Sequence, residues 1–355
     1  MAAAQYLKGQ LSRILIAGSG ALNLDLIYEV DSIAGLKVNG RPLEPGRELW
    51  GGRRQAQELL EQLEARGRLV AKVGGGSCAN TLSILAYLGV NCAFIGAAGD
   101  DPEGEFILNS MVGVDVSGVV RKGSSSICLV ILDAGTRDRA MFVAAGQGRM
   151  DSPTDRMEQV LREAGLFHFS SLAMDEGPRL QLELLDLLAH DALASFDPGE
   201  VYARRGLSDM ETLIERSRLV FMTDFELELL FGASSGRVRE CLGIMERARP
   251  SALEKEMALC LPLLVEKAGS KGAWLHGKGQ ELFSPAVQVD RIVDNTGAGD
   301  AFDAGFILGM LLGLGPSSCL GLGHMVASRS LSGYGRQWFH RLDDLYDEMK
   351  ERGMV

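Results

Sequence analysis

Short apolar segments and longer amphipathic segments alternate along most of the chain. The apolar segments have the length and composition of buried strands. They cover residues 13–18, 92–99, 166–171, 192–197, 218–223 and 261–267. The segments between them carry apolar positions three and four residues apart, which predicts helices. These helices are expected over residues 78–89, 153–164, 179–190, 208–216, 236–248 and 300–313. Strands joined by such helices form parallel βαβ units, so the pattern predicts an α/β fold with helices on both faces of a mostly parallel sheet.

Two stretches depart from this alternation. Residues 121–145 contain two apolar runs on either side of the sequence AGT, which predicts an antiparallel hairpin that projects from the main sheet. Residues 38–72 form an insert that ends in a charged helix, RRQAQELLEQLEARG. A further strand, VQVDRIV, is predicted over residues 287–293.

Composition and charge narrow the classes of function. The chain has 355 residues, 46% hydrophobic and 23% charged, which is typical of a soluble globular protein. Its net charge of −11 argues against binding to nucleic acids or anionic membranes. The longest apolar run, AGFILGMLLGLG, is shorter than the roughly 20 residues that cross a bilayer. Six scattered cysteines and five separated histidines lack zinc-site spacing, so we expect a reduced, cytoplasmic protein.

The stretch DNTGAGDAFDAGF carries the clearest chemistry in the chain. Gly297 and Gly299 permit a positive φ and a close approach of the backbone to a ligand. The free N–H groups at the start of the following helix form an anion site suited to a phosphate. Asp300 lies at the mouth of that site, where it either caps the helix or takes a proton from an attacking hydroxyl. The local sequence leaves both interpretations open.

This stretch resembles the C-terminal signature of the ribokinase-like (PfkB-type) carbohydrate kinases, a family that includes adenosine kinases. The resemblance implies a three-layer αβα fold with a small β-sheet lid, and transfer of phosphate from ATP, with Mg²⁺, to a primary hydroxyl of a sugar or nucleoside. It assigns Asp300 as the general base and the amides of Gly297, Ala298 and Gly299 as the anion hole. It also implies that Asp294 helps to bind a monovalent cation such as K⁺.

Two segments near the N-terminus resemble the family's acceptor-binding motifs. In GSGALNLD, Asn23 and Asp25 lie two residues apart, so an extended chain directs both side chains to one face, where they can clamp vicinal hydroxyls. In GGGSCANTLSILAYLG, the residues Gly75, Gly76 and Asn80 match positions that contact the substrate in the family. The alternative of a dinucleotide-binding fingerprint needs a third glycine where Asn23 stands, which argues against it.

Two segments of the C-terminal half resemble the nucleotide side of the family site. FMTDFELELLFG lies where the family has an N-x-x-E motif that orders the magnesium–phosphate network. Glu226 keeps the glutamate, Thr223 replaces the asparagine, and an acidic helix start explains Glu226 nearly as well. VEKAGSKGAWL resembles the strand and glycine turn beside the nucleotide, with Lys267, Gly269 and Gly272 as the matching residues.

Four other residues complete the sequence-based assignment. His324 lies in the segment that lines the adenine pocket in the family, although a lone histidine near an apolar helix is more often structural. Asp197 ends a predicted strand and is a second-tier site candidate, whereas Asp303 is expected to be an ordinary residue of the first helical turn. Ser77 replaces a lysine that many sugar kinases have, which favours a neutral acceptor.

The predicted organisation is one ribokinase-like domain over residues 1–355. Its lid elements are expected within about residues 19–50 and 112–146, and the α/β body is expected to take the remainder. The predicted partner is a small sugar or nucleoside, and a homodimer through the lid stays open. A catalytically silent sugar or nucleotide sensor on the same fold also stays open, because Thr223 departs from the family motif.

Overall fold

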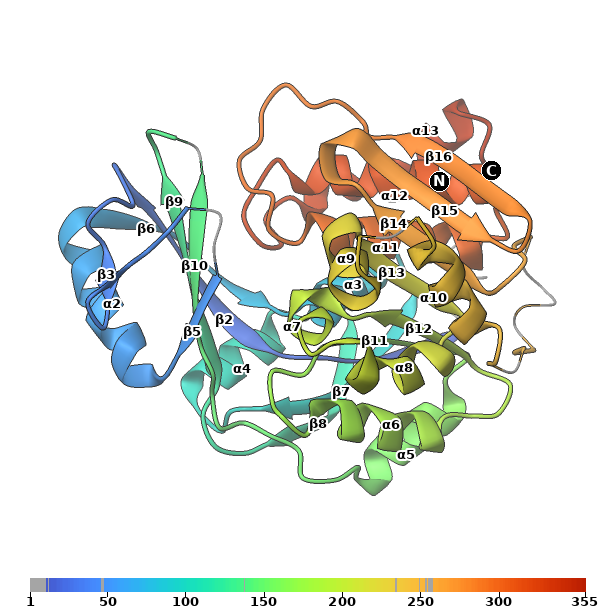
Figure 1. The fold of residues 1–355 in the computed structure, drawn as a ribbon, viewed down its shortest axis with the longest axis horizontal. Coiled ribbons are helices and arrows are strands. Elements are labelled where there is room, and N and C mark those ends of the chain that lie inside the picture. The colour runs from blue at the N-terminus through green and yellow to red at the C-terminus, as the bar shows by residue number, and fades with distance from the viewer. Residues whose placement is uncertain are drawn as a thin grey trace.

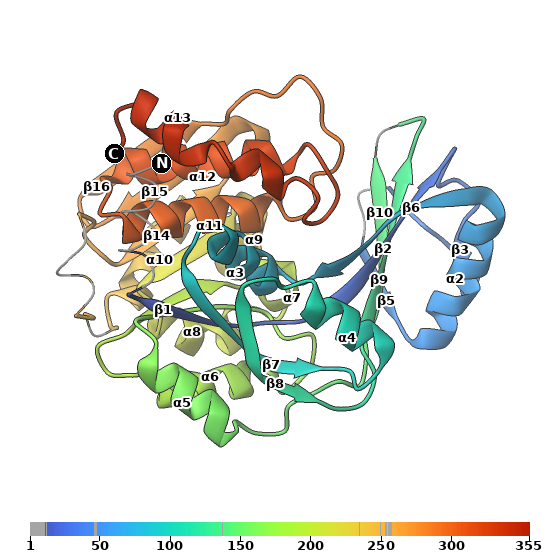
Figure 2. The same ribbon diagram turned by 180° about the vertical axis from the view of Figure 1, so that it is seen from behind.

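The computed structural model describes residues 11, 13–45, 48–136, 138–233, 235–248, 250–252, 254 and 258–355, and for Glu48 the backbone alone. A large α/β body and a smaller β-sheet lie side by side, at the right and left of Figure 1. Figure 2 shows the same two parts from behind, with the C-terminal end on the body.

The body is built on a nine-stranded sheet in the order β16-β15-β14-β13-β12-β11-β1-β7-β8. Its strands are β1 (Leu15–Ser19), β7 (Asn91–Ala98), β8 (Val114–Arg121), β11 (Leu166–Ser170), β12 (Leu193–Asp197), β13 (Leu219–Thr223), β14 (Leu263–Lys267), β15 (Gly272–Gly277) and β16 (Gln280–Pro285). All pairs from β8 to β14 are parallel, and β14, β15 and β16 pair antiparallel. The mostly parallel sheet is therefore confirmed, and each of the six predicted strands is present.

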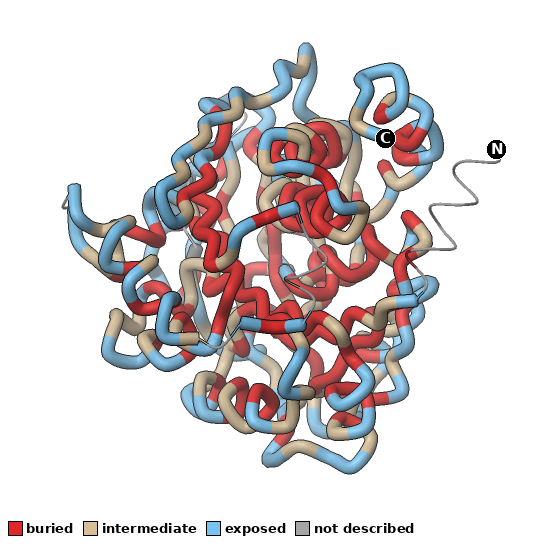
Figure 3. Tube along the Cα trace, turned by 90° about the vertical axis from the view of Figure 1, so that its right-hand side faces the viewer, coloured by how far each residue is buried: buried red, intermediate tan, exposed pale blue. Residues whose placement is uncertain are grey.

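Helices cover both faces of this sheet, which gives the predicted three layers. The first face carries α3 (Ser77–Tyr87), α11 (Ala298–Leu311), α12 (Pro316–Ser330), η3 (Phe339–Leu342) and α13 (Leu345–Glu351). The second carries α5 (Asp155–Glu163), α6 (Gly177–Leu187), α7 (Gly199–Ala203), α8 (Leu207–Glu215), α9 (Asp224–Phe231) and α10 (Arg237–Met245). Figure 3 shows buried residues running through the middle of the body, where the sheet meets the two helical layers.

The smaller sheet has five strands in the order β5-β10-β9-β2-β6. They are β2 (Asn23–Val30), β5 (Glu48–Gly51), β6 (Gly67–Gly75), β9 (Ser126–Asp133) and β10 (Arg139–Ala144). The predicted hairpin is the antiparallel pair β9–β10. The predicted insert helix is α2 (Arg53–Arg66), which packs Leu59 and Leu63 against the sheet face that carries Leu129 and Phe142. The short strands β3 (Lys37–Val38) and β4 (Arg41–Pro42) pair beside it.

The boundary of the smaller sheet differs from the predicted one. Residues 53–75 belong to it, because the chain returns from α2 as β6 and pairs antiparallel with β2. Residues 114–121 belong to the body, because β8 pairs parallel with β7. The sequence placed the first segment in the body and the second in the lid, since the pattern of apolar residues does not state which strand pairs with which.

Other details of the chain were not predicted. Residues 287–293 pair with no strand among the described residues, and Val287 and Ile292 are 40% and 57% exposed. The prediction of a strand there was wrong, because a β-branched run forms no strand without a neighbour to pair with. α4 (Pro102–Asn109) was not expected either, whereas the short helix η2 (Gly269–Lys271) lies at the predicted glycine turn. Within the part of the chain that the structure describes, every helix is too short or too polar to cross a bilayer.

Glycines allow α11 and α12 to pack closely, and this contact holds the start of α11 in place. A Cβ on Gly305 would lie 2.6 Å from the carbonyl oxygen of Leu322. Gly243, in α10, has nothing within 4 Å of the same position among the described residues. We predict that Gly305→Ala lowers the free energy of unfolding by roughly 1–3 kcal/mol, because backbone must move to admit the methyl group. The matched Gly243→Ala is expected to raise it by up to about 1 kcal/mol.

Urea denaturation of both variants checks this prediction. Equal effects of the two substitutions would contradict the close packing of α11 on α12.

Candidate active site

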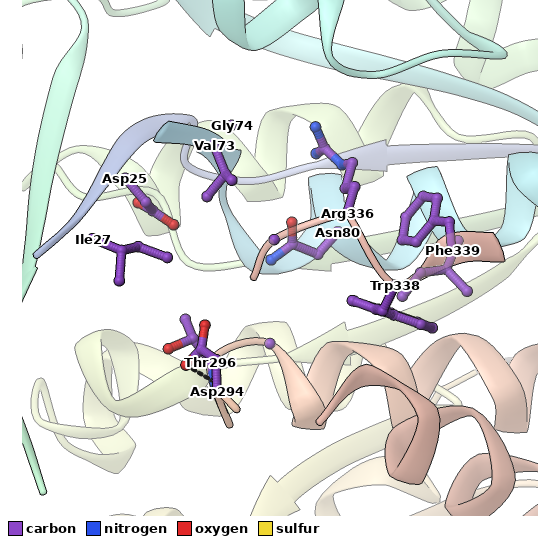
Figure 4. A pocket seen from close by; sticks show the side chains of 13 residues that line it. Asp25, Ile27, Val73, Gly74, Asn80, Asp294, Thr296, Arg336, Trp338 and Phe339 are labelled. Atoms are coloured by element: carbon purple, nitrogen blue, oxygen red, sulfur yellow. Dashed lines mark hydrogen bonds between the residues drawn. The ribbon is translucent and has the colours of Figure 1, made fainter. Parts of the chain in front are cut away.

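The candidate site lies where the body meets the smaller sheet. The carboxyl ends of β12, β13 and β14 point to this region, as expected for a ligand site in a parallel α/β sheet. The first turns of α3 and α11 approach it from one face of the body, and β2 and β6 of the smaller sheet approach it from the other side. Figure 4 shows the pocket between these elements.

The start of α11 has the backbone that an anion site requires. Gly297 is the residue before the helix and has a φ of +77°, a left-handed conformation that favours glycine. No side chain of the described residues caps this helix, although the Ala298 N–H donates to the Asn295 carbonyl oxygen at 3.3 Å. Asp300 lies in the first helical turn rather than at the cap. The capping interpretation of Asp300 therefore has no support in this geometry.

Asp300 is held in place by α3. The Asn80 Nδ2 group donates to Asp300 Oδ2 at 2.8 Å, and the Thr81 hydroxyl donates to the Asp300 carbonyl at 3.2 Å. Burial raises the pKa of Asp300 above its usual value, and the hydrogen bond from Asn80 and the charge of Lys267 oppose that shift. Residues 80 and 300, which are far apart in sequence, are thus joined directly, and Asn80 lines the pocket.

The predicted acceptor residues come together on the neighbouring strands. Asn23 and Asp25 face the same side of β2, and the Asn23 amide donates to the Asp25 carboxylate. Gly75 pairs with Asn23 across the sheet, and a Cβ there would lie 2.2 Å from Asp25 Oδ2. Gly76 has a φ of +118°, and a Cβ on it would lie 2.1 Å from the Ala21 carbonyl oxygen. Both glycines are therefore required by close contacts, which the sequence alone did not show.

Asp25 and Asp294 are buried acids on opposite walls of this pocket (Figure 4). Burial raises the pKa of Asp25 to about 7, and the neighbouring charges of Asp294 and Asp300 add to the shift. Asp294 Oδ1 accepts from the Thr296 N–H at 3.0 Å, but Asp294 Oδ2 is buried without a partner among the described residues. The pocket therefore has a buried carboxylate oxygen without a partner, which a ligand donor or a cation would supply.

Lys267 lies under the anion site and is bound by two buried carboxylates. Its Nζ is 2.9 Å from Asp197 Oδ2 and 3.1 Å from Asp303 Oδ1, and it lies 3.4 Å from where a Cβ on Gly299 would be. Asp303 is a residue of α11, as predicted, but it lies beyond the first turn and is fully buried. Burial lowers the pKa of Lys267, but the two carboxylates raise it above the ordinary value, so the ammonium stays charged.

Thr223 and Glu226 form a reciprocal cap at the start of α9. The Glu226 N–H donates to Thr223 Oγ1 at 3.2 Å, and the Thr223 N–H donates to Glu226 Oε2 at 2.8 Å. Burial raises the pKa of Glu226 to about 7, and the charge of Asp197 adds to the shift. Thr223 thus has a structural role as a helix cap. Glu226 lies near Asp197 and Lys267, whose charges act on its carboxylate.

The remaining predicted nucleotide residues lie around β15 and α12. Gly269 and Gly272 have φ of +57° and +132° in the turn between β14 and β15. The His324 Nε2 atom lies 3.0 Å from the Ser284 carbonyl oxygen, and its ring packs edge-on against Phe302. Burial lowers the pKa of His324. These contacts give His324 a structural role in joining α12 to β16.

Sequence reasoning missed a contact between the two sheets of the molecule. Arg139, on β10 of the smaller sheet, donates from Nη1 to Asn295 Oδ1 at 2.5 Å and to Thr296 Oγ1 at 2.9 Å. These two residues directly precede Gly297, so Arg139 joins the smaller sheet to the anion-binding loop. The sequence offered an arginine in a lid hairpin, but nothing in it indicated which body residues the arginine contacts.

Comparisons with known proteins show the family to which the chain belongs. Residues 54–338 match the family described as pfkB family carbohydrate kinase. The chain is 30% identical over 254 residues to an uncharacterised sugar kinase of Archaeoglobus fulgidus, which covers 71% of this chain and 95% of that protein. It is also 30% identical over 274 residues to an ATP-dependent ribose-1-phosphate kinase of Halopiger xanaduensis, covering 75% of this chain and 83% of the relative.

Solved structures show the same fold. Adenosine kinase from Sinorhizobium meliloti superposes with a TM-score of 0.75 at 20% identity, covering 91% of this chain and 95% of the other. Ribokinase from Arabidopsis thaliana superposes with a TM-score of 0.67 at 18% identity, covering 93% of this chain and 98% of the other. A ribokinase-like fold with a small separate sheet is thereby confirmed.

An uncapped helix start beside a buried carboxylate and a polar pocket has the geometry and charge that phosphoryl transfer to an alcohol requires. The chain belongs to the pfkB family of carbohydrate kinases, and it is a phosphotransferase with an alcohol group as acceptor.

Arg139 generates the first prediction for this site. Because hydrogen bonds from a charged donor contribute about 1.5–3 kcal/mol each, Arg139→Ala is expected to release the smaller sheet from the anion-binding loop. Backbone amide hydrogen exchange in β9 and β10 should then rise. Arg68→Ala is the matched control, because Arg68 pairs only with exposed Glu29 of the same sheet in the described structure. Equal exchange in the two variants would contradict the role of Arg139.

Asp25 generates a prediction on stability and pH. Its pKa of about 7 lies above its ordinary value of 3.8, so the folded state binds more protons than the unfolded state between these values. Stability is therefore expected to fall as pH rises from about 4 to 7, and to stay lower above that. Asp25→Asn should raise the free energy of unfolding at pH 8 by on the order of 2 kcal/mol. Denaturation of both proteins at pH 5 and pH 8 measures this; a gain that is equal at both pH values would rule it out.

Proposed function

We propose that this chain is an ATP-dependent kinase that phosphorylates a primary hydroxyl of a sugar or nucleoside, with Asp300 as the general base. The observation that carries the proposal is the position of Asp300 between two groups of residues, one suited to a phosphate and one suited to an acceptor hydroxyl. It follows the uncapped amides of Gly297, Ala298 and Gly299, and Asn80 fixes its carboxylate beside Asp25 in the acceptor pocket. A hydroxyl bound in this pocket has a base on one side and an anion site behind it.

The acceptor is bound by the residues at the edge of the smaller sheet. Asn23 and Asp25 supply donor and acceptor groups for neighbouring hydroxyls, and Gly75 and Gly76 let the backbone approach them. Relatives named as sugar and ribose-1-phosphate kinases, and a structural neighbour named as adenosine kinase, support an acceptor that carries a pentose or hexose.

The residues present fit a magnesium–nucleotide complex. No group of three or more His, Cys, Asp or Glu side chains among the described residues is arranged to hold a metal ion by itself. This suits Mg²⁺, which keeps several waters and binds through phosphates and one or two carboxylates, and Glu226 is the carboxylate we assign to that network. When bound, Mg²⁺ neutralises charge on the phosphates. Gly269, Gly272 and Lys267 flank the proposed phosphate path.

Asp294 supports a second, monovalent cation such as K⁺. Its Oδ2 atom is buried without a hydrogen-bond partner in the described part of the chain. A bound cation would give this oxygen the partner that it lacks. Its other oxygen is held by the Thr296 N–H, so such a cation would also stabilise the loop that leads into Gly297.

The chain's own residues account for the chemical step. Asp300 takes the proton of the acceptor hydroxyl as the oxygen attacks the phosphate, and the amides at the start of α11 stabilise the charge of the transferring group. Arg139 holds the smaller sheet against the loop and thereby excludes water, which would otherwise compete as acceptor. Catalysis then consists mainly of positioning and electrostatic stabilisation.

Asp300→Asn tests the proposal. The amide keeps the volume of the side chain but accepts no proton, so turnover should fall by roughly 10²- to 10⁴-fold while acceptor and ATP still bind. ADP release with a panel of sugars and nucleosides measures turnover, and calorimetry measures binding. Near-normal turnover in Asp300→Asn would refute the assignment. Ligand binding without ADP release in the unmodified protein would favour the silent sensor instead.

A further inference from the structure

Arg336 is a cation in the acceptor pocket that the proposed reaction does not use. It lies in the segment between α12 and η3, and it lines the same pocket as Asp25, Asn80 and Asp294. Figure 4 shows its side chain on the same wall as Gly74 and Asn80, across from Asp294. Its Nη1 group donates to the Ser110 hydroxyl at the end of α4. Its Nε and Nη2 atoms are buried and have no hydrogen-bond partner among the described residues.

These unpartnered groups require an explanation. Burial lowers the pKa of Arg336 to about 10, so the guanidinium still carries its charge at neutral pH. A buried donor without a partner destabilises a folded protein, and more so when the donor is charged. In addition, no carboxylate of the described chain lies within ion-pair distance of Arg336, although the charge of Asp25 acts on it. A charged group kept in this state is suited to a ligand that brings the missing acceptors.

The geometry of the unpartnered atoms specifies the chemistry of that ligand. The Nε–H and Nη2–H groups of a guanidinium point in one direction and form the edge that pairs with two oxygens of a carboxylate or phosphate. In Arg336 the opposite end, Nη1, is the end bound to Ser110. The contact with Ser110 therefore fixes the side chain and leaves the bidentate edge free.

We propose that the acceptor carries an anionic group, a phosphate or a carboxylate, which binds to the Nε and Nη2 groups of Arg336. The inference rests on the proposed function, because it takes this pocket to be the acceptor site. It replaces the expectation of a neutral acceptor, which came from Ser77 in place of a lysine: the positive charge comes from residue 336 instead. The anionic group lies away from the hydroxyl that is phosphorylated, since Arg336 forms no contact with Asp300.

The free space in the pocket adds a condition. The pocket encloses about 20 Å³, enough for about one water molecule. An acceptor of this class enters only when the smaller sheet, which contributes Asp25, Ile27 and Val73 to the pocket, moves away from the body. The contact between Arg139 and residues 295–296 opens in that movement.

Matched acceptor pairs test the proposal by turnover. Fructose and fructose 1-phosphate differ by a phosphate, glucose and gluconate differ by a carboxylate, and each compound has a free primary hydroxyl. We expect the anionic member of at least one pair to have the higher kcat/KM, and the pair identifies which anion is bound. Arg336→Met should lower that value on the order of 10²-fold and change the value for the neutral member less than about threefold. Arg336→Lys should lie between, because lysine keeps the charge but lacks the fork.

Arg341→Met is the matched control, since Arg341 lies in η3, directly after this segment, and is exposed outside the pocket. Its kinetics should equal those of the unmodified protein. A preference for the neutral member of both pairs would overturn the proposal. An equal loss for both members in Arg336→Met would also overturn it, because that result shows a structural role alone.

Binding to Asp300→Asn separates this inference from the kinase proposal, because binding needs no turnover. Calorimetry with the same four acceptors should show tighter binding of an anionic member, and Asp300→Asn/Arg336→Met should lose that difference. Such a result with no ADP release by the unmodified protein would refute the kinase proposal and leave the anion site standing. Turnover of neutral acceptors, without tighter binding of either anionic member, would refute the anion site and leave the kinase proposal standing.

Discussion

The hydrogen bond between Asn80 and Asp300 is the contact on which the arrangement of the site depends. It joins the first turns of α3 and α11, which come from opposite ends of the chain and enter the site from the same helical layer. The Asn80 amide sets the position of the Asp300 carboxylate, whereas burial is what raises the pKa of that carboxylate. The close packing of α11 on α12 at Gly305 then places the uncapped amides beside it. The contacts of α11 with α3 and α12 therefore set the positions of the proposed base and the proposed anion site together.

The site contains more negative than positive charge, and this charge is distributed over two neighbouring groups of residues. Beneath the anion site, Lys267 is shared by Asp197 and Asp303, so the ammonium offsets acids that are shielded from water. In the pocket, Asp25 and Asp294 face each other without a cation between them, and Arg336 stands to one side with its bidentate edge free. Burial raises the pKa of Asp25 to about 7, and the negative charges of Asp294 and Asp300 add to this shift. A phosphorylated or carboxylated ligand with hydroxyl groups would meet both needs at once.

The fold was largely predictable because its signals are local. Apolar runs separated by amphipathic helices specify parallel strands, and all six predicted strands of the body were found. The failures have a common cause, since pairing partners are not encoded in a single segment. Residues 287–293 have the composition of a strand and form none, while residues 67–75 pair with β2 and so belong to the smaller sheet.

The site followed the same rule. Asn23, Asp25, Asn80 and Asp300 were predictable because each lies in a motif, and the structure brings them together. The contacts of Arg139, Asp303 and Arg336 were missed, because they join residues more than 30 positions apart, which no single segment of the sequence encodes. Thr223 shows the opposite case, in which a departure from the family motif has a local explanation as a helix cap.

The position of Asn23 and Asp25 on β2 has a consequence for how the enzyme would select its acceptor. These residues are part of the smaller sheet itself, as is Gly75 on the adjoining β6. The groups proposed to bind the acceptor therefore belong to the same sheet that is proposed to close over it. Recognition and closure become a single event: an acceptor that engages β2 poorly also leaves the site open to solvent, with the base and the anion hole still apart from their substrate.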